Sequence, residues 1–256
     1  MTEAEKLEQG LLPGTWGPVF WLKSVGSTND YLLRLGDAAA DGTVVAADDQ
    51  TAGRGRRRHV WKAVPGMTLA LSFLLRRPAV PPALSLLCGL AAAQALEGLC
   101  GEGFGLKWPN DIVCAGKKVG GVLCEARLSA SGIGINLTQS AEQFRRAGLL
   151  CAASVRMLTG AAPSRGELAA ALLNRLHRLL ERARRGETPD ILAEFSRRCV
   201  TLGRPVRVST GSPAGGKFTG TALRLAPDGA LVVRTGRGEV TVTAGEVSVR
   251  GWMGYV

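Results

Sequence analysis

The C-terminal stretch of the chain, from Gly203 onward, has a pattern that no earlier stretch shares. Short runs of alternating apolar and polar residues are separated by turn-forming triplets at 227–229 and 236–238. Alternation with a period of two is typical of strands with one buried face, and about five such runs at this spacing predict a small antiparallel barrel. A domain boundary is therefore expected near 199–203. This predicts an N-terminal lead-in at 1–18, a first domain at 19–200 and a second domain at 201–256.

The first domain mixes helical and strand patterns. An apolar stretch at 83–99 predicts a largely buried helix. Ser164 and Glu167 form a capping box that predicts a long helix to about Arg185. The fold class expected is α+β, a mixed β-sheet with packed helices followed by the barrel, whereas 1–18 is expected to be poorly ordered. Strands are predicted at 19–25, 43–47 and 67–75.

The charge of the chain indicates an anionic partner. The formal net charge is +11 and the isoelectric point is about 10, which suits a nucleotide, a nucleic acid or an acidic protein without choosing among them. Arginines spread over solvated helix surfaces account for part of the excess positive charge.

No apolar run is long enough to predict a membrane span. The six cysteines form no CxxC pair, so neither a zinc site nor a disulfide framework is predicted, and a reducing cytoplasm is the expected compartment.

The segment 107–125 is the richest in chemical groups. Apolar runs at 112–114 and 119–123 flank a Gly-Lys-Lys turn, which predicts a strand–turn–strand hairpin. Paired glycines at 120–121 often mark the close approach of a ligand, and Lys118 beside them suits an anion. A surface hairpin with solvated lysines is the competing interpretation.

Two earlier segments also carry polar groups in a suggestive order. Residues 26–30 (Gly-Ser-Thr-Asn-Asp) begin a predicted helix, where Ser27 can act as the N-cap with or without contacting a ligand. Residues 48–61 form a loop of alternating glycine and arginine that suits phosphate oxygens. A nucleic-acid patch and a plain solvated loop remain alternatives, although Trp61 is the only aromatic residue near it.

Taken together, these segments resemble biotin–protein ligases. Four pieces match in order: 26–29, 50–57, 107–111 through Gly120-Gly121, and 134–136. The barrel resembles the SH3-like domain of the same family, and the resemblance covers roughly residues 20–250. It implies a catalytic domain of the class II aminoacyl-tRNA-synthetase/biotin-ligase type.

The resemblance implies a two-step reaction. Biotin and MgATP give biotinyl-5′-AMP and pyrophosphate, and the biotinyl group then passes to one lysine of a biotin carboxyl carrier protein. ATP and Mg²⁺ are the implied cofactors, and a homodimer formed through the catalytic sheet is implied as a further partner. Neither a nucleic acid nor a membrane is expected to bind.

The resemblance also implies roles for particular residues. Asp111 would hold Mg²⁺, which is otherwise bound through ATP phosphates, or would orient the acceptor lysine. The catalytic groups implied are Lys118, Arg54, Arg56 and Asp111. The biotin site would comprise Ser27, Thr28, Asn29, Gln50, Gly53, Arg54, Lys118 and Gly121, and the ATP site Arg56, Arg57, Trp61, Lys107, Asn110 and Asn136.

Three departures from the family pattern qualify these expectations. Only about 20 residues precede the first predicted strand, too few for a helix-turn-helix, so an enzyme without a repressor role is expected. Arg58 stands where the family loop often has a third glycine, which could slow loop closure. Residues 126–132 are short for the family, which indicates either a trimmed hairpin or a missing segment.

Two other functions remain open at this point. A lipoate-type protein ligase would also form an acyl-adenylate and transfer the acyl group to a carrier lysine, although the arginine–glycine loop and the 107–111 motif favour biotin. A basic nucleic-acid-binding protein would concentrate basic and aromatic residues on the barrel, whereas the densest basic segment is 54–58.

Overall fold

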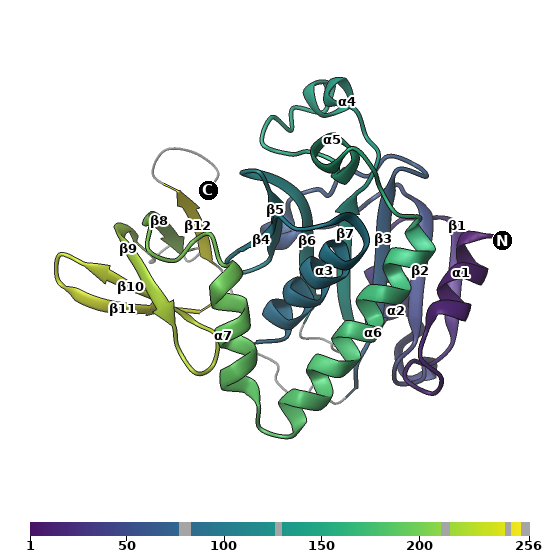
Figure 1. Ribbon diagram of the computed structural model, residues 1–256, viewed down its shortest axis with the longest axis horizontal. Helices are drawn as coiled ribbons and strands as arrows, with labels where there is room; N and C mark the ends of the chain where they lie inside the picture. The colour runs from purple at the N-terminus through teal and green to yellow at the C-terminus, as the bar shows by residue number, and fades with distance from the viewer. Residues whose placement is uncertain (77–82, 126–129, 211–215, 244–246, 252–256) are drawn as a thin grey trace.

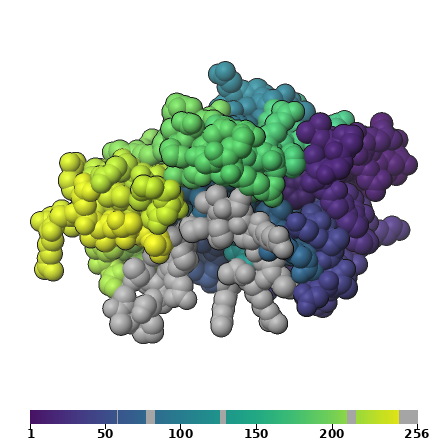
Figure 2. Space-filling model, turned by 90° about the horizontal axis from the view of Figure 1, so that it is seen from below, coloured from purple at the N-terminus to yellow at the C-terminus, as the bar shows by residue number. Residues whose placement is uncertain are grey.

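The computed structural model describes residues 1–76, 83–125, 130–210, 216–243 and 247–251. Figure 1 shows a large mixed sheet with helices packed against it and a smaller sheet at one end. In the space-filling view of Figure 2, the N-terminal and C-terminal parts of the chain lie at opposite ends of the molecule. Within the described ranges, no helix is long and apolar enough to span a membrane.

In the described part of the chain, seven strands form the large sheet, in the order β1-β2-β3-β7-β6-β5-β4. Strands β1 and β2 are parallel, and all the other neighbours are antiparallel. The strands are β1 Val19–Val25, β2 Val44–Gln50, β3 Thr68–Leu74, β4 Phe104–Lys107, β5 Asp111–Cys114, β6 Lys117–Glu125 and β7 Ala130–Asn136.

A helical layer covers one face of this sheet. Helices α3 (Leu84–Cys100) and α6 (Arg165–Arg184) pack against each other, and α1 (Glu3–Gly10) packs on α6. Alternate strand residues such as Leu71 and Phe73 point into this layer and are fully buried. Burial of this continuous apolar face is the main stabilising contribution expected for the domain.

The opposite face has a smaller cover. Helix α2 (Thr28–Leu35) packs on β2, β3 and β7, where Leu32, Val45 and Leu74 form a separate small cluster. The N-cap of α2 is Ser27, whose side chain accepts a hydrogen bond from Asp30 N, as the sequence predicted. Among the described residues, α2 is the helix that packs on this face, and a cavity lies beside its N-cap and first turn.

Within the described ranges, five antiparallel strands form the C-terminal sheet, in the order β11-β10-β9-β8-β12. It follows α7 (Thr188–Arg198) and joins the first sheet through Trp108, whose indole Nε1 donates to Gly229 O at 3.0 Å. The predicted fold class, an α+β catalytic domain with an SH3-like C-terminal module, is confirmed. The strands are β8 Pro205–Thr210, β9 Lys217–Leu225, β10 Leu231–Thr235, β11 Gly238–Val242 and β12 Val247–Gly251.

The structure corrects the prediction for the start of the chain. Residues 3–10 are helical rather than poorly ordered, because Thr2 and Glu5 form a capping box and Leu7 is buried against the helical layer. The sequence pattern missed this helix because it is only two turns long. It also missed β4 and the short helices α4 (Ala141–Arg146) and α5 (Val155–Thr159).

The predicted hairpin exists, with a shifted turn. Residues Ala115 and Gly116 both have positive φ angles, 46° and 72°, and make the two-residue turn between β5 and β6. The lysines predicted to form this turn are instead the first residues of β6. In the short segment 126–132, residues 126–129 lie outside the described ranges, while 130–132 belong to β7 and pair with β6.

Candidate active site

A row of very small residues crosses the open face of the sheet. Gly121 of β6 pairs with Gly134 of β7, which pairs with Ala70 of β3. At the other end of the row, Gly121 pairs with Asp111 of β5, and Asp111 pairs with Lys107 of β4. Residues that pair across strands lie on the same face, so this row, called the glycine floor here, is a surface almost without side chains that has a carboxylate and an ammonium at one end.

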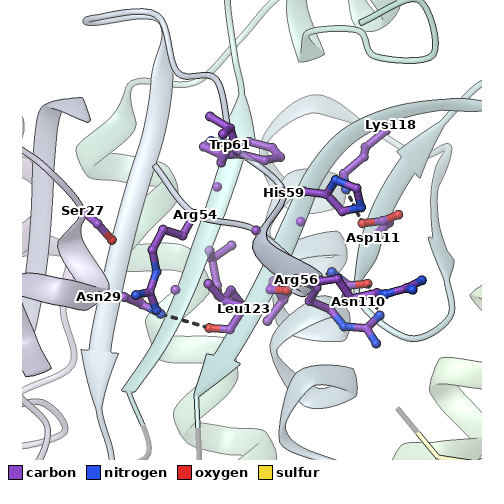
Figure 3. Close-up of a pocket in the computed structure, with 18 of the residues that line it drawn as sticks. Ser27, Asn29, Arg54, Arg56, His59, Trp61, Asn110, Asp111, Lys118 and Leu123 are labelled. Atoms are coloured by element: carbon purple, nitrogen blue, oxygen red, sulfur yellow. Dashed lines mark hydrogen bonds and ion pairs between the residues drawn. The ribbon is translucent and has the colours of Figure 1, made fainter. Parts of the chain in front are cut away.

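A cavity of about 350 Å³ lies over this floor. Figure 3 shows Ser27 and Asn29 on one side of it and Asn110, Asp111 and Lys118 on the other. Its walls come from α2, the end of β2, the loop 51–61, β6 and β7. The cavity therefore joins two different ends. The polar end is lined mainly by hydroxyl and amide groups, with Arg54 beside them, and the charged end is lined by Asp111, Lys118 and Arg56.

The polar end is a connected hydrogen-bond network. Gln50 Oε1 accepts from Thr28 N at 2.8 Å and from Thr28 Oγ1 at 3.0 Å. Ser72 Oγ lies 2.7 Å from Thr28 Oγ1 and 2.6 Å from Asn29 Oδ1. Because Asn29 and Ser72 are almost fully buried, these bonds fix their orientation.

The charged end contains more cations than anions. Lys118 Nζ forms an ion pair with Asp111, and Arg56 Nη1 donates to Asn110 Oδ1 at 3.1 Å. Burial lowers the pKa of the Arg56 guanidinium from its ordinary value, and the nearby Asp111 carboxylate opposes this shift. Arg57 and Lys107 complete the basic groups of this end.

The predicted arginine–glycine loop folds into a small hairpin at the cavity wall. Trp61 N donates to Gly53 O at 2.9 Å, and Gly55 N donates to His59 O at 2.7 Å. A Cβ atom at Gly53 would lie 2.4 Å from Trp61 O, so this close approach requires glycine. Arg57 has a φ of 55° at the tip of the loop, an uncommon conformation for a non-glycine residue.

The indole of Trp61 forms part of the cavity wall. It lies against Gly134, where an added Cβ would be 2.5 Å from Trp61 Cε2, and Lys118 Nζ is 5.8 Å from its ring centroid. Trp61 Nε1 is buried and has no hydrogen-bond partner among the described residues. A second cavity of about 340 Å³, lined in part by Gln139 and Phe144, also touches Trp61.

Most of the residues predicted for the site line the first cavity. Two do not: Gly53 supports the loop hairpin, and Asn136 is buried nearby, where its Oδ1 accepts from Gln139 Nε2 at 3.1 Å. Their proposed ligand contacts remain predictions, as do all the roles assigned to the other residues. The predicted residues that line the cavity are Ser27, Thr28, Asn29, Gln50, Arg54, Arg56, Arg57, Trp61, Lys107, Asn110, Asp111, Lys118 and Gly121.

Sequence reasoning missed several groups at or beside the site. His59 and Leu123 line the cavity, and Ser72 belongs to the polar network. Glu125 accepts from Asn29 and forms an ion pair with Arg54. The signal for Ser72 was a polar residue inside a buried strand, because such a residue requires a hydrogen-bond partner.

The carboxylates near the cavity suit a Mg²⁺ ion that enters with a nucleotide. In the described part of the chain, no group of three or more acidic, histidine or cysteine side chains could hold a metal. Among the described residues that line the cavity, Asp111 is the single carboxylate, and it is ion-paired with Lys118. Mg²⁺ is commonly bound through one or two carboxylates together with substrate phosphates, so Asp111 is the residue that would contact it.

Known proteins resemble this chain over nearly its whole length. Residues 21–138 match the biotin/lipoate A/B protein ligase family, and residues 201–250 match the biotin protein ligase C-terminal domain. The biotin–[acetyl-CoA-carboxylase] ligase of Mycobacterium tuberculosis is 35% identical over 91% of this chain and 89% of that protein. The ligase of the same name from Paracoccus denitrificans is 31% identical over 88% of this chain and 98% of that protein.

A solved structure agrees with this likeness. The biotin protein ligase from Aquifex aeolicus in complex with biotin and ATP superposes with a TM-score of 0.80 at 31% identity, covering 92% of this chain and 100% of that one. The paired residues of the glycine floor, from Ala70 to Gly134, lie within the residues 21–138 that match the ligase family. The chain belongs to the biotin–protein ligase family.

Proposed function

We propose that this chain joins biotin to ATP in the cavity over the glycine floor and then transfers the biotinyl group to a carrier-protein lysine. The observation that carries this proposal is the two-ended cavity. Its polar end, lined mainly by hydroxyl and amide groups, suits the ureido ring of biotin, and its charged end suits a carboxylate and a triphosphate. Because these sites lie in one continuous space, the two reacting groups can be held in line.

In the first step, a biotin carboxylate oxygen attacks the α-phosphorus of ATP, and pyrophosphate leaves. The two reactants are both anions, so the site must offset their repulsion. Lys118 and Arg56 are the groups proposed to do so, because both line the basic end of the cavity. When bound to ATP, Mg²⁺ would neutralise further phosphate charge, with Asp111 as the residue beside it.

In the second step, the carrier lysine attacks the biotinyl carbonyl, and AMP leaves. The amine must lose a proton to react, and Asp111 is the carboxylate at that end of the cavity. Because Asp111 is ion-paired with Lys118, movement of Lys118 toward a bound phosphate would release Asp111 for this purpose.

The polar end favours biotin over lipoate as the substrate. Thr28, Asn29 and Gln50 line it, and each carries hydrogen-bonding groups. A ureido ring has a carbonyl and two N–H groups that can join this hydrogen-bond network, whereas a dithiolane ring has only sulfur atoms, which are weak acceptors. A site that forms hydrogen bonds to its substrate discriminates strongly against an analogue that cannot form them.

The acceptor proposed is a biotin carboxyl carrier protein of a carboxylase. The net charge of +11 would speed the encounter with an acidic carrier through electrostatic steering. A homodimer through the catalytic sheet remains a prediction, which sedimentation of the purified protein tests.

The test of this function is biotin-dependent exchange between ATP and pyrophosphate, with lipoate as the parallel substrate and Lys118→Ala as the control variant. We expect exchange with biotin alone, reduced by about 10² to 10³ in Lys118→Ala. Exchange with lipoate alone would show that lipoate, and not biotin, is the acid that the protein activates. No exchange with either acid, from folded protein, would contradict the proposed first step.

A further inference from the structure

One carboxylate beside the cavity links the loop 51–61 to the polar network. Glu125, the last residue of β6, forms an ion pair with Arg54 through Oε1, and its Oε2 accepts from Asn29 Nδ2 at 2.8 Å. Arg54 belongs to the loop, and Asn29 belongs to α2. The side chain of Glu125 is 21% exposed, so this interaction is partly shielded from water.

Arg54 also forms a second ion pair, with Asp30 of α2. Arg54 Nη1 lies 2.7 Å from Asp30 Oδ1, so one guanidinium connects the loop to two carboxylates on two different elements. Such an arrangement is a small network rather than an isolated surface pair, and networks contribute more than isolated pairs. Figure 3 shows Arg54 beside Asn29 at the polar end of the cavity.

The hydrogen bonds fix the orientation of the Asn29 amide. Its Nδ2 group donates to Glu125 and to Leu123 O at 3.3 Å, so its Oδ1 atom must face Ser72. Asn29 is 3% exposed. Loss of the Glu125 acceptor would therefore free both the amide at the polar end and the arginine that fastens the loop.

We propose that Glu125 is a positioning residue that fastens the loop 51–61 over the cavity through Arg54 and orients Asn29 at its polar end. Glu125 is absent from the described residues that line the cavity, so it acts through other side chains. The inference rests on the proposed function only for its effect on biotin; the fastening of the loop is independent of the substrate.

Kinetics of adenylation give the first test. Glu125→Gln retains the size of the side chain and an acceptor for Asn29 but loses the charge that holds Arg54. If the loop is fastened over the cavity in a smaller fraction of the molecules, the apparent affinity for biotin falls by the same factor as that fraction. We expect KM for biotin to rise about fivefold in Glu125→Gln, with kcat changed less than about twofold, and a larger rise in KM when Asp30→Asn is added.

Trypsin gives a second test that needs no activity. Cleavage after Arg56 and Arg57 reports loop opening in the protein without ligands and is followed by mass spectrometry. We expect faster cleavage there in Glu125→Gln, with the thermal midpoint near that of the parent chain. The matched control is Glu239→Gln, which breaks an Arg224–Glu239 ion pair in the C-terminal sheet and should change neither loop cleavage nor KM.

A double-variant comparison shows whether Glu125 acts through Arg54. In an Arg54→Gln background, Glu125→Gln should accelerate loop cleavage no further, because the interaction is already lost.

Unchanged cleavage in Glu125→Gln would overturn the inference even if biotin-dependent exchange is present. A lower kcat with unchanged KM would also overturn it, because that result places Glu125 in the chemical step. If the parent chain shows no exchange, the cleavage results still decide the role of Glu125.

Discussion

The two faces of the seven-stranded sheet use the same strands for different purposes. Phe73 of β3 points into the helical layer and packs edge-on against Trp16, with ring centroids 5.3 Å apart. Its neighbour Ser72 points to the other face and belongs to the polar network beside the cavity. Both residues are fully buried, yet one contributes to the apolar core and the other to a pre-oriented set of polar groups.

We infer from this difference that strand alternation separates the residues that stabilise the fold from those proposed to bind the ligand. Successive strand residues point to opposite faces, so a substitution on one face leaves the other face largely in place. The helical face should therefore determine the free energy of unfolding, and the open face should determine ligand affinity. Substitutions on each face test this separation.

The largest effect is expected from Phe73→Ala. Removal of a fully buried aromatic side chain leaves a cavity and reduces the free energy of unfolding by about 3 to 5 kcal/mol. Urea denaturation measures this loss. At a temperature where the variant stays folded, we expect KM for biotin within about twofold of the parent value, and a much larger change in KM would contradict the separation of the two faces.

The next largest effect is expected from Gly134→Ala. The added Cβ would lie 2.5 to 2.8 Å from three atoms of the Trp61 indole, so the indole or the loop must move. We expect adenylation to fall by about 10² because a displacement near 1 Å can have that effect. Gly236→Ala is the matched control, since nothing lies within 4 Å of its added Cβ. Full activity of Gly134→Ala would show that the position of Trp61 is unimportant.

A smaller effect is expected from Ser72→Ala. This change leaves Asn29 Oδ1 without the hydroxyl 2.6 Å away, and an unsatisfied buried acceptor reduces stability by about 1 to 3 kcal/mol. We expect KM for biotin to rise about tenfold while the thermal midpoint falls less than in Phe73→Ala. Isothermal titration with biotin measures the affinity directly, and an unchanged affinity would remove Ser72 from the binding network.

The smallest effect concerns the helical layer and pH. Hydrogen bonds from the Ser164 side chain and backbone lower the pKa of Glu167 below its ordinary value of 4.5. A carboxyl group whose pKa is lower in the folded state stabilises the fold at pH values above its unfolded-state pKa. This contribution is lost as the pH falls through the folded-state pKa. Because Glu167 is 54% exposed, we expect Glu167→Gln to flatten the acid decline in stability by about 0.3 kcal/mol or less. Thermal midpoints between about pH 6 and pH 3 provide the measurement, and activity at pH 7 should not change.

The sequence predicted the apolar face better than the open face. The runs around Leu71 and the helix at 83–99 are long enough for periodicity to identify them, whereas α1 and β4 are short and were missed. The order of the motifs identified most of the residues around the cavity. It did not identify Glu125 or Ser72, because their importance comes from partners far away in the chain, although the polar Ser72 inside a buried strand indicated that it needs a partner.

The pairing of β3 with β7 also has a consequence for how the protein folds. Leu74 pairs with Ala130 and Thr68 with Asn136, so this single ladder joins an early three-stranded unit to a later four-stranded one. The 55 residues 75–129 separate the two strands, and such distant contacts form slowly because the chain must first lose loop entropy. The glycine floor lies across this junction, so neither unit alone has a complete cavity. A ligand that spans the floor therefore binds only the joined state and adds its binding free energy to the association of the two units.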